Sequence, residues 1–201
     1  MIPPRFPKPH ADFVRFPKPY ADFVARLRVP CGFALVAAFA WFSHPAARSL
    51  AFGLPVSLIG LALRAWAAGH LAKNQALATS GPYAYTRNPL YLGTLLVAAG
   101  LVIASRSVGL GLLFAAVFVL IYLPVIQLEA QHLRTLFPEY GEYAAGVPAL
   151  LPWRRTEVRR GTLKRAPRGR GFQWALYVKN GEYQAALGFL AGALFLLWKV
   201  S

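Results

Sequence analysis

Apolar residues fall into five blocks along this chain, separated by stretches rich in proline, tyrosine or charge. The blocks cover residues 29–42, 50–69, 90–105, 108–128 and 185–198. Within each block the apolar positions run almost continuously, instead of recurring every three or four residues as on a helix with one face in water. The second and fourth blocks hold about 20 residues, which is enough to cross roughly 30 Å of hydrocarbon as a helix.

This pattern predicts an all-α fold, an integral membrane helical bundle with about five transmembrane helices. The first and last blocks have lengths that also fit re-entrant or tilted segments, so four spans is the alternative. Composition points the same way. The chain is 57% apolar and 14% charged, whereas a soluble domain has about 25% charged residues.

Positive charge gives the predicted bundle a direction. The formal net charge is +15, and with the N-terminus in the cytoplasm eighteen of the 22 lysines and arginines fall on the cytoplasmic side. Three fall on the other side, and Arg64 lies inside a block. This is the positive-inside pattern, and contact with anionic headgroups explains the excess charge better than binding to nucleic acid. The composition is rich in Ala, Arg, Gly and Pro, which is typical of a bacterium with a GC-rich genome. We therefore expect the membrane to be a bacterial cytoplasmic membrane.

The same pattern divides the chain into four parts. Residues 1–28 form a basic, proline-rich tail in which residues 5–14 recur as 15–24 with only His10 replaced by Tyr20. We expect the tail to be extended near the lipid surface, with docking of a partner as the alternative. Residues 29–153 form the membrane core, 154–184 a basic cytoplasmic loop and 185–201 a C-terminal membrane helix.

A polar, aromatic run at residues 81–93 stands between two apolar blocks. It reads Gly-Pro-Tyr-Ala-Tyr-Thr-Arg-Asn-Pro-Leu-Tyr-Leu-Gly. Gly81 and Pro82 end any helix that enters from the second block. Asn88 and Pro89 then suit the N-cap and first position of a new helix, whose N-terminus favours an anionic group. Arg87 lies one residue earlier and adds a candidate bidentate grip.

A second polar cluster follows the fourth block. Glu129 begins it, and Leu128, His132, Leu136 and Tyr140 repeat every four residues along one helical face. A carboxylate at the membrane edge needs a partner. We expect Glu129 to accept hydrogen bonds from a ribose or ammonium group, or else to pair with Arg87 or Arg134. Histidine and cysteine spacing indicates no metal site.

Together the two clusters resemble the isoprenylcysteine carboxyl methyltransferase family, which is related to membrane phospholipid methyltransferases. The first cluster matches a motif with a glycine at each end, here Gly81 and Gly93. The second matches a run that begins at two glutamates and ends in Val-Pro. The matching positions are Tyr83, Arg87, Asn88, Pro89 and Tyr91 in the first cluster, and Glu129, Ala130, Leu133, Phe137, Tyr140, Tyr143, Val147 and Pro148 in the second.

The resemblance implies an S-adenosyl-L-methionine-dependent membrane methyltransferase with a cytoplasmic cofactor pocket and a lipid or lipidated acceptor. Arg87 and Glu129 are the implied catalytic residues. The implied cofactor-binding residues are Gln75, Ala76, Leu77, Ala78, Tyr83, Asn88, Pro89, Leu90, Tyr91 and Glu129.

Three positions depart from the family pattern. Asn88 replaces a histidine, Ala130 replaces the second glutamate, and Val125 replaces an arginine associated with the carboxylate of the substrate. Arg64 or Arg134 is a candidate substitute for that arginine. We therefore expect methyl transfer to a carboxylate, as in isoprenylcysteine carboxyl O-methylation. The alternatives are N-methylation of a phospholipid headgroup, a nicotinamide-dependent reductase and a non-enzymatic membrane scaffold.

Overall fold

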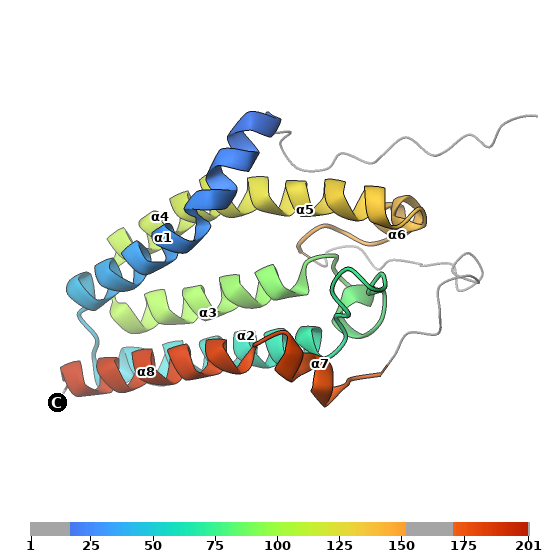
Figure 1. The fold of residues 1–201 in the computed structure, drawn as a ribbon. Helices are drawn as coiled ribbons and strands as arrows, with labels where there is room; N and C mark the ends of the chain where they lie inside the picture. Colours follow the sequence, from blue (N-terminus) through green and yellow to red (C-terminus); the bar gives the residue numbers. More distant parts are fainter. Residues whose placement is uncertain (1–16, 152–170, 201) are drawn as a thin grey trace, which may run out of the picture.

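A computed structural model of the chain describes residues 17–151 and 171–200, and in these ranges the regular structure is entirely helical (Figure 1). The first copy of the repeat and most of the basic stretch 154–184 lie outside the described residues. The elements are α1 Lys18–Phe42, α2 Ala47–Ala68, the 3₁₀ turn η1 Gly81–Ala84, α3 Pro89–Ser105, α4 Val108–Val117, the π-helical turn η2 Phe118–Tyr122, α5 Leu123–Leu136, α6 Tyr140–Gly146, α7 Trp174–Lys179 and α8 Tyr183–Val200.

The predicted helical membrane bundle is confirmed, and each of the five apolar blocks is helical. In the described ranges, three helices are long and apolar enough to cross a membrane: Ala47–Ala68, Val108–Leu136 and Tyr183–Val200. Helix α1 makes a fourth if its two bent halves count as one span, and Pro89–Ser105 is a shorter apolar helix. Large apolar side chains cover the outside of the bundle, with Trp41 80% and Phe52 67% exposed. Lipid is the solvent that such a surface requires.

Helix α1 begins at Lys18, within the second copy of the repeat and eleven residues before the apolar block. It bends by 52° between Leu27 and Val29, next to Pro30, as a helix does where a proline removes a backbone donor. Tyr20, the residue that distinguishes the second copy from the first, donates its hydroxyl to the Leu120 carbonyl at 2.8 Å.

That carbonyl is available because of a proline in the facing helix. Pro124 has no N–H to donate to Leu120, four residues earlier, and the backbone widens there into the π-helical turn η2. Tyr20 supplies a replacement donor for Leu120. The N-terminal part of α1 is thus held against the middle of the continuous helix 108–136, and these elements pack together in the fold.

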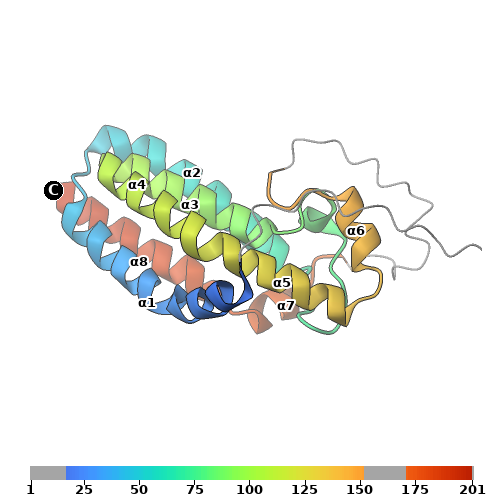
Figure 2. The same cartoon turned by 90° about the horizontal axis from the view of Figure 1, so that it is seen from above.

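The long helices pack in two groups. Helix α2 packs against α3 and α8, while α1 packs against α4, η2 and α5. Figures 1 and 2 show the long helices running roughly side by side, with η1, α6 and α7 gathered at one end and the C-terminus at the other. The two polar clusters of the sequence therefore lie at the same end of the bundle.

Helices α2 and α3 approach each other until their backbones touch. A Cβ atom on Gly60 would lie 2.6 Å from the Gly93 carbonyl oxygen, and Gly53 faces Gly100 in the same way. Between these contacts, the Ser57 hydroxyl donates to the Val97 carbonyl at 2.9 Å. Small residues and interhelical hydroxyl bonds are what hold helices together in lipid, where apolar side chains gain nothing by leaving the tails.

We expect Gly60→Ala to destabilise the bundle by about 1–3 kcal/mol, because the added methyl group must push two backbones apart. Gly188→Ala is the matched control, since a Cβ atom there meets nothing within 4 Å. Thermal unfolding in detergent measures both variants. Equal unfolding temperatures for the two variants would contradict the importance of the α2–α3 contact.

Candidate functional site

The loop between α2 and α3 carries the first polar cluster and turns sharply at η1. Gly81 has a φ of +60°, and a Cβ atom there would lie 2.7 Å from Nε2 of His70. Only glycine meets both conditions without strain. The turn buries Tyr83, which is 6% exposed, and brings the chain to Pro89, where α3 begins.

The end of the second cluster holds this loop in place. Arg87 donates its backbone N–H to the Pro148 carbonyl at 2.9 Å. The Asn88 side chain donates to the Ala149 carbonyl at 2.8 Å, and the Tyr143 hydroxyl donates to the Tyr83 carbonyl at 2.7 Å. Two motifs about sixty residues apart in the sequence are thus joined into one unit.

Asn88 stands at the N-cap position of α3, as expected, but its side chain makes no capping hydrogen bond. The side chain is engaged with Ala149 instead. Pro89 occupies the first turn of α3, as the sequence indicates, and is buried.

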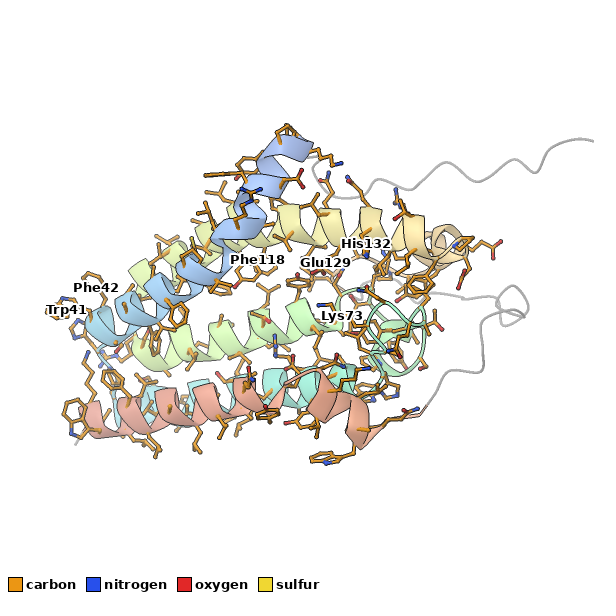
Figure 3. All side chains as sticks on the ribbon, viewed as in Figure 1. Trp41, Phe42, Lys73, Phe118, Glu129 and His132 are labelled. Carbon is orange, nitrogen blue, oxygen red and sulfur yellow. The ribbon has the colours of Figure 1, made fainter. Side chains whose placement is uncertain are left out.

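A cavity of about 1080 Å³ lies beside this unit, between the loop, α3, α5 and α1. Eight of the predicted site residues line it: Ala76, Leu77, Ala78, Tyr83, Arg87, Leu90, Tyr91 and Glu129. Gln75 is exposed and, like Asn88 and Pro89, is not among the lining residues. Figure 3 shows Glu129 and His132 on α5 near the loop that carries Lys73, at the end of the bundle far from Trp41 and Phe42.

Glu129 and Tyr91 form the polar centre of the cavity. The Tyr91 hydroxyl donates to Oε1 of Glu129 at 2.9 Å, which joins α3 to α5. One helical turn beyond Glu129, His132 also lines the cavity, and Lys73 and Arg87 contribute positive charge from the loop. The site thus offers carboxylate acceptors, hydroxyl groups and cations within one space.

Two buried tyrosines in the cavity wall, Tyr83 and Tyr143, stay neutral. Burial raises the pKa of Tyr83 well above its usual value, and the charges of Glu129 and Glu182 add to the rise. Burial, together with the neighbouring Tyr140 and Tyr83, likewise raises the pKa of Tyr143. Both phenols therefore act as hydrogen-bonding groups and not as anions.

Apolar side chains line the rest of the cavity. Helix α1 contributes a stripe with helical spacing, and α5 contributes Val125 and Leu128. The α1 stripe consists of Ala25, Val29, Gly32, Phe33 and Val36. The cavity thus has a polar end beside the loop and an apolar side along α1.

Sequence reasoning missed one part of the site. Arg64, noted as a charge inside an apolar block, forms a bidentate ion pair with Glu182, the residue before α8, with N–O distances of 3.0 and 2.7 Å. Both residues line the cavity. In the sequence, the arginine itself indicated this part of the site, because a charge in a membrane helix requires a partner. The identity of that partner was not predictable from spacing.

Residues 32–140, more than half of the chain, match the phospholipid methyltransferase family. The chain belongs to this family. The broader part of the resemblance is therefore confirmed, while prenylcysteine carboxyl methylation stays a prediction. The family match includes both glycines of the first motif as well as Arg64, Tyr91 and Glu129.

Two curated proteins are similar to part of this family member. The cobalt-zinc-cadmium resistance protein CzcN of Cupriavidus metallidurans is 38% identical over 105 residues, and the nickel-cobalt-cadmium resistance protein NccN of Alcaligenes xylosoxydans xylosoxydans is 34% identical over 105 residues. Each match covers 49% of this chain and 49% of the relative, so the chain spans about half the length of these curated relatives. No solved structure matches the chain. Within the described residues, no three His, Cys, Asp or Glu side chains gather as a metal site.

We expect Tyr143→Phe to lower the free energy of unfolding by about 1–3 kcal/mol, because the Tyr83 carbonyl loses its buried donor. Tyr85→Phe, at a side chain that is 61% exposed, is the control. Chemical denaturation in detergent at neutral pH measures the difference. An unchanged stability in the Tyr143 variant would show that this bond does not hold the two motifs together.

Alkaline pH tests the neutral state of these tyrosines. Their pKa values are raised in the folded protein, so the stability they contribute is complete below pH 10 and declines as the pH rises above it, where tyrosines of the unfolded chain ionise. The unfolding temperature should fall above pH 10, and less steeply in Tyr143→Phe than in Tyr85→Phe. Parallel falls in the two variants would contradict the assignment.

Proposed function

We propose that this protein transfers a methyl group from S-adenosyl-L-methionine to a lipid-borne acceptor in the bacterial cytoplasmic membrane, with its N-terminus and cavity on the cytoplasmic side. One observation carries the proposal. A single cavity joins the polar centre at Glu129 and Tyr91 to an apolar stripe on α1. A water-soluble cofactor and a membrane-embedded acceptor need these two environments next to each other.

The residues present fit the cofactor. Its ribose hydroxyls need an acceptor such as the Glu129 carboxylate, and its own carboxylate needs a cation such as Arg87 or Lys73. Its sulfonium group is favoured by aromatic faces, which Tyr83 and Tyr91 supply. All five residues line the cavity. Members of the phospholipid methyltransferase family generally use S-adenosylmethionine, which supports the assignment.

When bound, S-adenosylmethionine supplies a methyl group already activated by the sulfonium charge. The work of the chain is then to position the acceptor and exclude water. The apolar residues of α1 and α5 exclude water on the acceptor side. Arg87 orients the carboxylate of the cofactor near the N-terminus of α3. If the acceptor is an amine, Glu129 accepts the proton that the ammonium must lose before it can react.

The acceptor class predicted from the sequence was a carboxylate, with Arg64 or Arg134 as its anchor. Arg64 is instead occupied by Glu182, and Val125 supplies no charge at the family position for that arginine. The pairing of Arg64 with Glu182 and the missing charge at Val125, together with the family match, favour the amine of a zwitterionic phospholipid headgroup as the acceptor. The acyl chains would lie along the α1 stripe.

We expect Tyr91→Ala and Glu129→Ala each to weaken binding of S-adenosylmethionine at least about tenfold, which corresponds to the loss of one hydrogen bond to a charged group. Glu142→Ala, an exposed glutamate on α6 outside the cavity, is the control. Calorimetry on detergent-purified protein measures affinity for S-adenosylmethionine and S-adenosylhomocysteine, with NADPH as the comparison.

Three results would speak against the proposal. Binding of neither adenosyl ligand by folded wild-type protein would favour the scaffold. Binding of NADPH alone would favour a reductase. Wild-type affinity in both cavity variants would show that the cofactor binds elsewhere.

A further inference from the structure

The turn between α7 and α8 reaches the cavity from outside the residues that match the family. Asn180 and Glu182 both line the cavity, whereas the family match ends at residue 140. The part of the wall that they form therefore lies outside the matched core. Glu182 is its charged member.

The Arg64 guanidinium makes four hydrogen bonds at this wall. Its Nε and Nη2 donate to the two carboxylate oxygens of Glu182, and its Nη1 donates to the Leu90 carbonyl and the Thr94 hydroxyl on α3. The side chains of Arg64 and Glu182 are only 22% and 10% exposed. Gly93 makes the route possible, because a Cβ atom there would lie 2.5 Å from Cγ of Arg64.

The carboxylate is held in place by its own turn. Asn180 donates to the carbonyls of Ala68 and Leu71, both at 2.9 Å, and so ties the turn to the end of α2. Gly181 has a φ of +70°, which lets the chain reverse between α7 and α8. Glu182 therefore faces Arg64 from a fixed backbone position.

The ion pair between Arg64 and Glu182 determines the net charge of the cavity wall that a headgroup would contact. Arg64, Lys73 and Arg87 line the cavity, opposed by Glu129 and Glu182. With the pair intact, the inner wall beside α3 is neutral. Without Glu182, the wall would hold a partly buried guanidinium, and a charge in such surroundings attracts anions more strongly than one in water.

We propose that Glu182 is a positioning residue that sets acceptor selectivity, because it neutralises Arg64 and so favours a zwitterionic headgroup over an anionic one. This inference rests on the proposed function. It predicts that the two partners have opposite effects on the binding of anions, and that removing both charges cancels those effects. A purely structural role of the ion pair predicts no such opposition.

The test compares Glu182→Gln, Arg64→Gln and the double variant, with Glu142→Gln as a control outside the cavity. The probes are an S-prenylated N-acetylcysteine, which is an anionic amphiphile, and lysophosphatidylethanolamine, which is zwitterionic. Calorimetry in detergent measures the affinity ratio of the two. Thermal unfolding of each variant verifies that it is folded.

In Glu182→Gln, we expect affinity for the anionic probe relative to the zwitterionic one to rise about tenfold, the scale of one partly screened charge interaction. In Arg64→Gln the ratio should fall, and in the double variant it should return to within about threefold of wild type. If Glu182→Gln does not fold, the fall in Arg64→Gln and its reversal in the double variant test the same inference.

Unchanged ratios, or a double variant that resembles either single variant, would overturn the inference. Transfer of a labelled methyl group by the wild type to phosphatidylethanolamine vesicles separates this result from the proposed function. Methyl transfer with unmoved ratios refutes the role of Glu182 alone. Shifted ratios without methyl transfer or cofactor binding refute the proposed function and leave charge selection as a property of a binding protein.

Discussion

The backbone contact between α2 and α3 is the constraint on which the rest of the structure depends. In lipid, apolar side chains do not drive helices together, so the contact has to come from close packing and hydrogen bonds. Gly53 and Gly60 meet Gly100 and Gly93, and Ser57 bonds across the seam. This contact fixes the end of α2 relative to the start of α3. The loop that joins them must then fold back over itself, and it carries half of the candidate site.

Gly93 links this packing to the chemistry of the cavity. Its missing side chain lets Gly60 approach and also leaves room for Arg64 to cross from α2 to α3. A guanidinium inside an apolar helix is costly unless it is paired and hydrogen-bonded. Leu90, Thr94 and Glu182 meet those requirements together. One small residue thus serves both the stability of the bundle and the polarity of the cavity wall.

Much of this arrangement could be predicted from the sequence, because the signals involved are local. Hydropathy located the five apolar helices, because a helix in contact with lipid needs a long run of apolar residues. Turn and helix-start residues placed the loop, and Tyr83, Tyr91 and Glu129 do line one cavity. Whether they bind a cofactor stays a prediction.

Other features could not be predicted, because they depend on tertiary contacts. Helix α1 begins at Lys18, in a proline-containing segment, where Tyr20 bonds to a facing helix. Gln75 is exposed although its neighbours Ala76 to Ala78 line the cavity, since a loop gives no periodicity from which to read direction. Arg64 and Glu182 are 118 residues apart, and no local pattern pairs them.

The position of Asn88 also gains a physical meaning. In the isoprenylcysteine carboxyl methyltransferase pattern that the sequence resembles, this residue is a histidine, and the exchange removes a group that titrates near neutral pH. The Asn88 amide donates to the Ala149 carbonyl and is not among the residues that line the cavity. A histidine N–H can make the same kind of bond to a carbonyl. What this position needs is a side-chain donor that binds the 147–149 segment to the start of α3, and asparagine supplies one without a change of charge.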